Sequence, residues 1–350
     1  MAMRVAIVKL SALGDIVHAM AALQFVKQAL PEIHLDWVVE QGFAGVLRDN
    51  PDIDQVLTVN LKSLKQRKRN LFGEIGKVRR YARNHYDWVI DAQGLIKSAI
   101  TARLLSPHTA GFDKHSIREK PAALFYKQTV AIPYDANSID RNAAVIARPL
   151  GISISEQQIL AKKPFLFYQA PDPQLAHYFT ENKANVVFVI GSTWPSRNYP
   201  KQKYLQVIDA LAVNSLIVWG NEAERQAAEW IAQRSAATVL PRMNLNDLKA
   251  VLDRADLVIG NDTGPTHMAW GLNRPSITLF GPTPVSRVYQ TPINRVLKSS
   301  SIVNPFKLDK NDFSIAEINA SDVITMAESL LETKTSRHHD ESGSARRAGK

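Results

Sequence analysis

The chain contains 350 residues, of which 45% are hydrophobic and 22% charged, and this composition is typical of a globular protein of about two domains. It has no cysteine, which excludes disulfides, zinc–thiolate sites, iron–sulfur clusters and cysteine nucleophiles, and which fits a reducing cytoplasm. It also has no apolar run long enough to span a membrane or to act as a secretion signal, while its net charge of +10 predicts an anionic partner.

The first half of the chain alternates between β-branched apolar runs and stretches with helical spacing. The pattern predicts strands at residues 4–10, 35–40, 55–60, 86–94, 108–112 and 128–133. It predicts helices at residues 15–30, 43–48, 95–105 and 138–150. An irregular stretch with three prolines, residues 153–173, is the candidate linker to the second half.

The same alternation then restarts. It predicts strands at residues 186–192, 215–220, 237–241, 256–262 and 275–281, and helices at residues 203–212, 222–235, 245–255, 266–272 and 314–331. Such alternation produces parallel sheets that helices cover on both faces. We therefore predict an α/β fold with two Rossmann-like domains, residues 1–160 and 161–333, whose sheets face a central cleft. Residues 334–350 have no apolar periodicity, and we expect a disordered tail.

Most of the positive charge lies in one segment, residues 61–83. Nine lysines and arginines stand there against the single acid Glu74, a balance of 9 − 1 = +8. The segment is a solvated helix face, a nucleic-acid site or a docking site for an anionic surface or a phosphorylated substrate. Aromatic residues are sparse in it, which argues against stacking on bases.

The loop after the first strand, KLSALGDIVHAM (Lys9–Met20), carries the first candidate site. Gly14 permits a tight turn, and Asp15 stands where the following helix begins. Asp15 is either a helix cap or a general base, because ligands of such folds bind at the carboxyl ends of strands. His18 lies one turn further along. The loop lacks the GxGxxG pattern, which argues against a dinucleotide-dependent dehydrogenase.

Two loops in the second half have features that suit a phosphate. IGNDTGPTHMAWGL (Ile259–Leu272) leads from a strand into a helix, whose first N–H groups can bind an anion, and its Gly264 allows close approach. An ordinary capped helix is the alternative interpretation of this loop. The other loop combines two hydroxyls with one cation, namely Ser192, Thr193 and Arg197, and its alternative interpretation is a solvated loop.

Further polar residues follow other strands. Glu222 and Glu224 can bind ribose hydroxyls or interact with the dipole of the helix that they begin. In the first half, the polar residues at strand ends can receive an acidic sugar or form structural ion pairs. They are Gln93, Lys97, Lys114, Arg118 and Glu119.

Taken together, these segments resemble a known family. KLSALGD, VIDAQGLIKSA, SIRE followed by LFY, LPRMNLNDL, VIGNDTGPTHMAWGL and ITLFGPT resemble, in order, the lipopolysaccharide heptosyltransferases of glycosyltransferase family nine. The resemblance extends from residue 3 to about residue 331. DAQGLIKSA and SIRE are more similar to the type I enzymes than to type II.

The resemblance implies a GT-B fold, two Rossmann-like domains with the site between them, and an inverting transfer of L-glycero-D-manno-heptose from ADP-heptose to the Kdo of Kdo-lipid A, in lipopolysaccharide inner-core synthesis. On this interpretation no cofactor and no metal ion is required, since no acidic DxD-type pair with flanking aromatic residues is evident, and the sequence does not settle whether a divalent ion assists. Asp15 corresponds to the family's proposed base. The residues that correspond to donor contacts are Ser192, Thr193, Arg197 (usually a lysine in the family), Glu222 or Glu224, Met243, Asp262, Thr263, Gly264 and His267.

The acceptor side is expected to use polar residues of the first half and the basic segment. On this interpretation the basic residues bind lipid A phosphates and anionic lipid, so that the enzyme is cytoplasmic and peripheral on the inner face of the inner membrane. The expected acceptor-binding residues are Lys9, Gly14, His18, Gln93, Lys97, Arg118, Lys65, Arg67, Lys68 and Arg69.

Three alternatives remain. A related transferase could use another acceptor, as type II enzymes do. A nucleotide-sugar epimerase could share the fold and would need no acceptor. A nucleic-acid-binding protein would exploit the positive charge, but the sequence contains no helix-turn-helix, RNA-recognition or zinc motif. We therefore expect no nucleic-acid partner, and the sequence does not indicate an oligomeric state.

Overall fold

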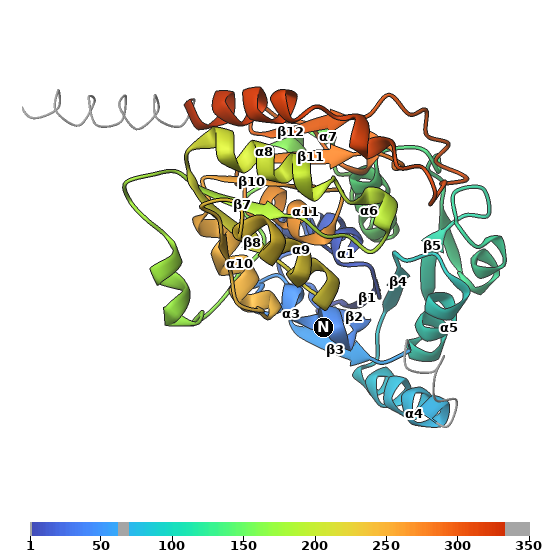
Figure 1. The fold of residues 1–350 in the computed structure, drawn as a ribbon. Coiled ribbons are helices and arrows are strands. Elements are labelled where there is room, and N and C mark those ends of the chain that lie inside the picture. The colour runs from blue at the N-terminus through green and yellow to red at the C-terminus, as the bar shows by residue number, and fades with distance from the viewer. Residues whose placement is uncertain (1, 62–69, 333–350) are drawn as a thin grey trace, which may run out of the picture. The chain divides into compact units, whose positions relative to one another are not determined.

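The computed structural model describes residues 2–61 and 70–332, and the chain divides into two compact units (Figure 1). The first comprises Met1–Gln169 together with the short segment Ser286–Tyr289, and the second comprises the remainder. The basic residues Lys65, Arg67, Lys68 and Arg69, like the tail 334–350, lie outside the described residues. No helix in the described part of the chain is both long and apolar enough to cross a bilayer.

The first unit is built on a six-stranded parallel sheet with the order β3-β2-β1-β4-β5-β6. Its central strands are apolar on both faces because helices cover both, and residues such as Val8 and Val89 are fully buried. The strands are β1 (Arg4–Val8), β2 (His34–Glu40), β3 (Gln55–Val59), β4 (Trp88–Asp91), β5 (Thr109–Phe112) and β6 (Gln128–Val130). The helices are α1 (Leu13–Met20), α2 (Leu23–Ala29), α3 (Ala44–Leu47), α4 (Leu71–Tyr81), α5 (Ile96–Leu105), α6 (Ser138–Ala147) and α7 (Glu156–Leu160).

The second unit repeats the topology, with the order β12-β11-β10-β7-β8-β9 and all strands parallel. Its strands are β7 (Asn185–Val189), β8 (Asn214–Val218), β9 (Thr238–Val239), β10 (Leu257–Asn261), β11 (Ser276–Phe280) and β12 (Asn294–Lys298). Its helices are α8 (Lys201–Leu211), α9 (Glu222–Ala232), α10 (Leu245–Arg254) and α11 (Gly264–Gly271), followed by a helix over residues 320–332.

Both sheets have the strand order of the Rossmann fold, and this order locates a ligand site in each. The order reverses between β1 and β4 in the first sheet and between β7 and β10 in the second. Ligands of open parallel sheets bind outside the carboxyl ends of the strands at such switch points. The candidate ligand sites are therefore the residues that follow β1 and β4, and those that follow β7 and β10. The predicted pair of Rossmann-like folds is confirmed.

Some predicted elements differ from the structure. The helix predicted at 15–30 is two helices, α1 and α2, because the chain makes a tight turn at Ala21–Ala22 in which the N–H of Ala22 bonds to the carbonyl of Ala19. The single helix predicted at 314–331 is a short 3-10 turn followed by the helix 320–332. The linker candidate contains α7, and β12 had no counterpart in the prediction.

The passage after residue 160, where the sequence indicated a domain boundary, continues the first unit as far as Gln169. Phe165 and Leu166 are buried, and the side chain of Asn50 donates a hydrogen bond of 2.9 Å to the carbonyl of Phe165. Burial and hydrogen bonding thus keep this irregular chain with the first unit, although it belongs to neither a strand nor a helix.

Candidate functional site

The first candidate site follows β1. The Asp15 carboxylate accepts a hydrogen bond of 3.3 Å from the backbone N–H of Ala12, which precedes α1. Asp15 is therefore the third residue of the helix and reaches back to its start, as the acid of a capping box does. Gly14 lies within the first turn of α1, so it does not form the tight turn that the sequence predicted. His18 is buried in the last turn of the same helix.

The protonation state of Asp15 depends on burial and on nearby positive charges. Burial alone would raise the pKa of this carboxyl, but the positive charges of Lys9, Arg287 and His18 outweigh burial and lower the pKa below its ordinary value. Lys9 is itself buried and donates a hydrogen bond of 2.7 Å from Nζ to the carbonyl of Ala92. Burial lowers the Lys9 pKa, and Asp15 and Asp91 partly oppose that effect. A carboxylate that stays ionised at neutral pH is available as a proton acceptor.

Gln93 shapes the loop that carries these groups. Its Oε1 accepts hydrogen bonds of 3.0 Å from the backbone N–H groups of both Leu10 and Ser11. The residue predicted to contact an acceptor thus joins the end of β4 to the loop after β1. Its side-chain oxygen satisfies two backbone donors that otherwise have no strand partner.

The Asp91 carboxylate holds the backbone of Gln93 in place. Its side chain is fully buried and accepts hydrogen bonds from the Gln93 N–H at 2.8 Å, the Ser98 hydroxyl at 2.8 Å and the Tyr126 hydroxyl at 2.7 Å. Tyr126 reaches it across Gly111, where a Cβ would stand 2.4 Å from the tyrosine ring. Burial raises the pKa of Asp91 even though these donors oppose it. The DAQG motif is therefore a hydrogen-bonded platform for the loop after β1.

Lys97 and Arg118 are exposed beside this platform. Lys97 lies in the first turn of α5, and Arg118 precedes Glu119, whose Oε2 accepts a hydrogen bond of 2.8 Å from the N–H of Ile96. Glu119 thus caps α5 and holds the SIRE segment against the start of that helix. The two cations are free to reach an anionic ligand at the surface of the unit.

The second candidate site follows β10 and centres on Asp262, which is 1% exposed. Its Oδ1 lies 2.9 Å from Nε2 of His267, and its Oδ2 accepts a hydrogen bond of 2.7 Å from the hydroxyl of the buried Thr283. Arg197 approaches Oδ2 to 3.4 Å and also donates a hydrogen bond of 3.3 Å to the carbonyl of Asp262. Asp262 is thus the hub that orients a histidine and an arginine.

Arg197 is held on a second side by Trp194. Its guanidinium lies over the indole at 4.4 Å from the ring centroid, a cation–π contact. Ser192 fixes this loop, because its hydroxyl donates to the carbonyl of Trp194 at 3.0 Å and accepts from the N–H of the same residue at 3.3 Å. Thr193, between them, is exposed. The loop after β7 therefore presents one cation and one hydroxyl on a fixed backbone.

The start of α11 completes this site. Thr263 precedes the helix with an extended backbone, and its side chain forms no capping bond, so the hydroxyl is available to a ligand along with the first N–H groups of the helix. Asn261 joins this start to the loop after β7: its Oδ1 accepts from the N–H of Tyr199 at 3.0 Å, and its Nδ2 donates to the carbonyl of Ile190 at 2.9 Å. A helix start, hydroxyls and a paired arginine make an anion site.

Glu224 and Glu222 differ sharply in position. Glu224 Oε2 accepts a hydrogen bond of 2.7 Å from the N–H of Gly220, and a Cβ on Gly191 would stand 2.1 Å from the Glu224 carboxyl carbon. Its carboxylate thus lies at the carboxyl ends of β7 and β8. Glu222 pairs with Arg225 at 3.0 Å on the surface, with 61% of its side chain exposed. Glu224 is at the site, and Glu222 points to solvent.

A sequence model of glycosyltransferase family 9 (heptosyltransferase) matches residues 75–310, which is more than half of the chain. The chain belongs to glycosyltransferase family 9. This glycosyltransferase is 34% identical to lipopolysaccharide heptosyltransferase 1 of Campylobacter coli, over 94% of this chain and 99% of that protein. It is 33% identical to lipopolysaccharide heptosyltransferase 1 of Escherichia coli K12, over 80% of this chain and 88% of the other.

A solved structure shows the same fold. The chain superposes on E. coli heptosyltransferase WaaC with ADP-2-deoxy-2-fluoro heptose, with a TM-score of 0.75 and 28% sequence identity, over 93% of this chain and 99% of that one. The GT-B fold consists of two Rossmann-like domains, as in this chain, so the predicted fold class is confirmed. The prediction of a glycosyltransferase is also confirmed.

The glycosyltransferase gathers most of the predicted residues at its two switch points. In the first unit these are Lys9, Gly14, Asp15, His18 and Gln93. In the second unit they are Ser192, Thr193, Arg197, Asp262, Thr263, Gly264 and His267. Met243 is half-buried in the loop between β9 and α10, beyond the end of the neighbouring strand.

Three residues with clear roles in these sites were missed from sequence. Thr283 supports Asp262, Asn261 joins two loops, and the charge of Arg287 acts on Asp15. Asn261 carried a usable signal, because a polar residue that ends an apolar strand at a switch point needs partners. Thr283 and Arg287 follow β11 and carried none, since their partners are far away in the sequence.

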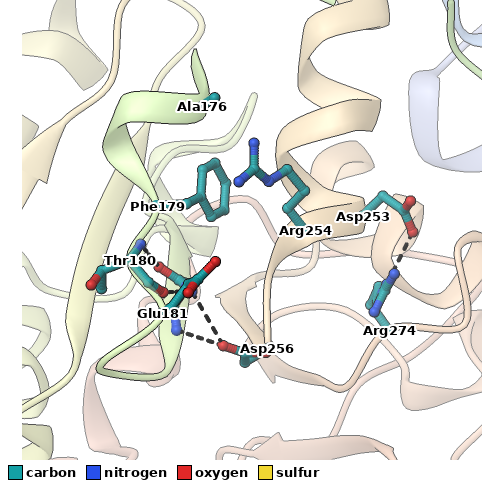
Figure 2. A pocket seen from close by; sticks show the side chains of 9 residues that line it. Ala176, Phe179, Thr180, Glu181, Asp253, Arg254, Asp256 and Arg274 are labelled. Atoms are coloured by element: carbon teal, nitrogen blue, oxygen red, sulfur yellow. Dashed lines mark hydrogen bonds and ion pairs between the residues drawn. The ribbon is translucent and has the colours of Figure 1, made fainter. Parts of the chain in front are cut away.

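A separate pocket of about 500 Å³ lies in the second unit, at the amino ends of the strands of its sheet (Figure 2). Asn185 begins β7 there, and Asp256 immediately precedes β10 and accepts a hydrogen bond of 2.7 Å from the Asn185 N–H. Arg274 pairs with Asp253 at 3.0 Å on the far wall. Because it opens at the amino ends of the strands, this pocket is distinct from the candidate site and contains none of the predicted residues.

Proposed function

We propose that this glycosyltransferase transfers L-glycero-D-manno-heptose from ADP-heptose to the Kdo of Kdo-lipid A, with inversion at the anomeric carbon. The observation that carries the proposal is the similarity to relatives named lipopolysaccharide heptosyltransferase 1, which extends over 94% of the chain. The geometry supports it, because one unit presents an ionised carboxylate and the other an anion site at their switch points.

On this proposal the second unit binds the donor. The N–H groups at the start of α11, the hydroxyls of Thr263 and Thr193, and the Arg197 guanidinium hold the diphosphate. Ser192 fixes the backbone of its loop through Trp194. Glu224 accepts hydrogen bonds from ribose hydroxyls, and Met243 contacts the adenine. These groups stabilise the negative charge that develops on ADP as it leaves, and they are already in place before the reaction.

Asp15 is the general base of the proposed reaction. A sugar hydroxyl is a poor nucleophile, so removal of its proton by a carboxylate accelerates attack on the anomeric carbon. The hydroxyl proton passes to Asp15 while the new glycosidic bond forms, and the bond between the anomeric carbon and the diphosphate oxygen breaks. Attack from the face opposite the leaving ADP inverts the anomeric centre.

The acceptor side is proposed to recognise acidic groups and a lipid surface. Lys97 and Arg118 are exposed beside the loop of Asp15, and the basic segment adds further cations. Phe72 is 82% exposed at the start of α4, within that basic segment. An exposed aromatic ring among cations suits an anionic membrane surface, which would make the enzyme peripheral on the inner face of the inner membrane.

The first experiment measures ADP release with ADP-heptose, with and without Kdo-lipid A, for the wild type and for Asp15→Asn. Asp209→Asn, at an exposed aspartate of α8, is the matched control. Acceptor-dependent release that Asp15→Asn abolishes supports both the transfer and the base. Release that the variant retains removes Asp15 from this role. Tight ADP-heptose binding without release indicates another acceptor, as for type II enzymes, and no binding refutes the donor.

The acceptor proposal has its own test. Exchange of Lys65, Arg67, Lys68 and Arg69 for glutamate should raise the KM for Kdo-lipid A several-fold and weaken sedimentation with phosphatidylglycerol vesicles, because both depend on charge attraction. Affinity for ADP-heptose should not change. Unaltered acceptor kinetics in this variant would refute the role of the basic segment.

A further inference from the structure

A short segment of the chain belongs to the first unit, although the residues before and after it in the sequence belong to the second. This segment, Ser286–Tyr289, is here called the strap. The buried Tyr289 donates a hydrogen bond from its hydroxyl to the carboxylate of Asp140, and Asn137 donates one of 3.0 Å from Nδ2 to the carbonyl of Val288. Both partners belong to the start of α6, where Asn137 caps the helix and Asp140 lies in its first turn.

The strap brings a cation to the proposed base. Helix α6 packs against α1, the helix that carries Asp15, so the start of α6 is a fixed support on the first unit. Arg287 directly precedes the two anchored residues, Val288 and Tyr289, and is half-buried. It interacts electrostatically with both Asp15 and Lys9. Its charge therefore acts on the loop after β1.

The other charged groups near Asp15 are less able to take this role. Lys9 comes from the end of β1 and is committed to the carbonyl of Ala92 at 2.7 Å. His18 comes from α1 and is buried. Arg141 of α6 acts electrostatically on Lys9, and its guanidinium donates to the backbone carbonyls of Ser116 and Pro133. Among these four groups, Arg287 alone comes from outside the first 170 residues, and its charge is permanent.

We propose that Arg287 is a positioning residue, the electrostatic partner that holds the Asp15 carboxylate charged and in place for catalysis. The inference rests on the proposed function, in which Asp15 is the base. An arginine suits this role because its charge is permanent and its planar guanidinium fits a carboxylate. Asp15, which lies near the start of the chain, thus depends on Arg287, which follows β11.

The test compares the pH dependence of kcat/KM in the wild type, Arg287→Gln and Arg287→Lys, with ADP-heptose and Kdo-lipid A. Arg287→Gln should move the acid limb upward by about one pH unit, because an opposite charge nearby lowers a carboxyl pKa by about one to three units. Arg287→Lys should restore most of the shift, and the KM for ADP-heptose should stay unchanged. Arg103→Gln, at an exposed arginine of α5, is the matched control.

A purely structural strap predicts a different result. Arg287→Gln would then lower activity equally at every pH, together with the melting temperature, and this outcome overturns the proposal. If Arg287→Gln does not fold, Arg287→His provides the second variant, because histidine loses its charge near pH 6.5. Its kcat/KM should gain an extra ionisation near that pH, and a profile identical in shape to the wild type overturns the proposal.

A readout without turnover separates this inference from the proposed function. The Asp15 carboxyl can be titrated by carbon NMR in the wild type and in Arg287→Gln, with Asp15→Asn used to assign the signal. An upward shift of about one unit in the variant supports the positioning role, and an unchanged titration refutes it. A wild type that releases no ADP with Kdo-lipid A refutes the proposed function and leaves this titration valid.

Discussion

The hydroxyl of Thr283 donates a hydrogen bond of 2.7 Å to Oδ2 of Asp262, and both side chains are almost completely buried. A buried carboxylate needs every donor that it has, because each unpaired oxygen retains its full cost of desolvation. Through Asp262 this single hydroxyl supports the orientation of Arg197 and His267. On the proposed function, Thr283 therefore contributes to donor binding although it lies outside the loops that suit a phosphate.

We expect Thr283→Val to destabilise the fold by roughly 1.5 to 3 kcal/mol, the usual contribution of a hydrogen bond to a charged group. The KM for ADP-heptose should rise at the same time, because Arg197 loses a fixed partner. Thermal unfolding and donor kinetics measure both effects. Thr283→Ser keeps the hydroxyl and serves as the control, and a valine variant with wild-type donor KM would contradict the role of Thr283.

Substitution of Gln93 should lower kcat without weakening the binding of the donor. Gln93→Met removes the oxygen that accepts from the N–H groups of Leu10 and Ser11, so the loop that carries Asp15 loses its support. We expect kcat to fall about ten- to a hundredfold, the range that follows from small displacements of a catalytic group. The KM for ADP-heptose should not change. Gln93→Glu keeps an accepting oxygen and should retain more activity than the methionine variant; the reverse order would contradict this assignment.

The two glutamates of α9 offer a matched pair. Glu224→Ala should raise the KM for ADP-heptose about tenfold, equivalent to about 1.4 kcal/mol, because its carboxylate lies at the strand ends. Glu222→Ala removes only a surface pair with Arg225, and such pairs contribute about 0 to 1 kcal/mol. Its donor KM should equal that of the wild type. Equal effects of the two variants would show that the hydrogen bond to Gly220 does not define the ribose site.

Lys162 should make the stability of the protein depend on pH. The side chain is 6% exposed, its ammonium lies 5.3 Å from the Phe165 ring centroid, and burial lowers its pKa to about 7. The unfolded chain therefore binds this proton more tightly, so the free energy of unfolding rises as pH increases from about 7 towards the unfolded pKa, by at most about 4 to 5 kcal/mol. Below pH 7 both states are protonated and this contribution is flat.

Lys162→Met tests this prediction by denaturant unfolding at several pH values. The variant should be more stable than the wild type at pH 7, because it buries no charge, and its stability should lose the rise between pH 7 and 10. A variant with the same pH dependence as the wild type would show that other groups dominate in this range.

The strands at the centre of each sheet could be predicted because both of their faces are buried and they read as apolar runs. The edge strand β12 was missed, since its sequence, NRVLK, mixes charged and apolar residues, as a half-exposed strand does. The break between α1 and α2 was missed because apolar spacing continues through Ala21 and Ala22, and only the backbone shows the turn.

Site residues could be predicted where their role depends on their own strand end. Asp15 and Gln93 follow strands at the switch point of the first sheet, and Asp262 follows a strand at the switch point of the second. Topology alone therefore places them where ligands of such sheets bind. The choice between Glu222 and Glu224 needed coordinates, because it depends on which carboxylate lies against Gly191. Arg287 lies far from Asp15 in the sequence, so local sequence patterns could not predict their interaction.

The strap also determines how this protein can be dissected. A fragment that ends at Gln169 has every described strand and α-helix of the first unit, yet it lacks the strap, in which Val288 and Tyr289 bind the start of α6. Because each unit consists of separate stretches of the chain, division of the chain at one position does not yield either unit whole. A first unit intended to retain the environment of Asp15 has to be expressed with Ser286–Tyr289 supplied by a fused peptide or by circular permutation.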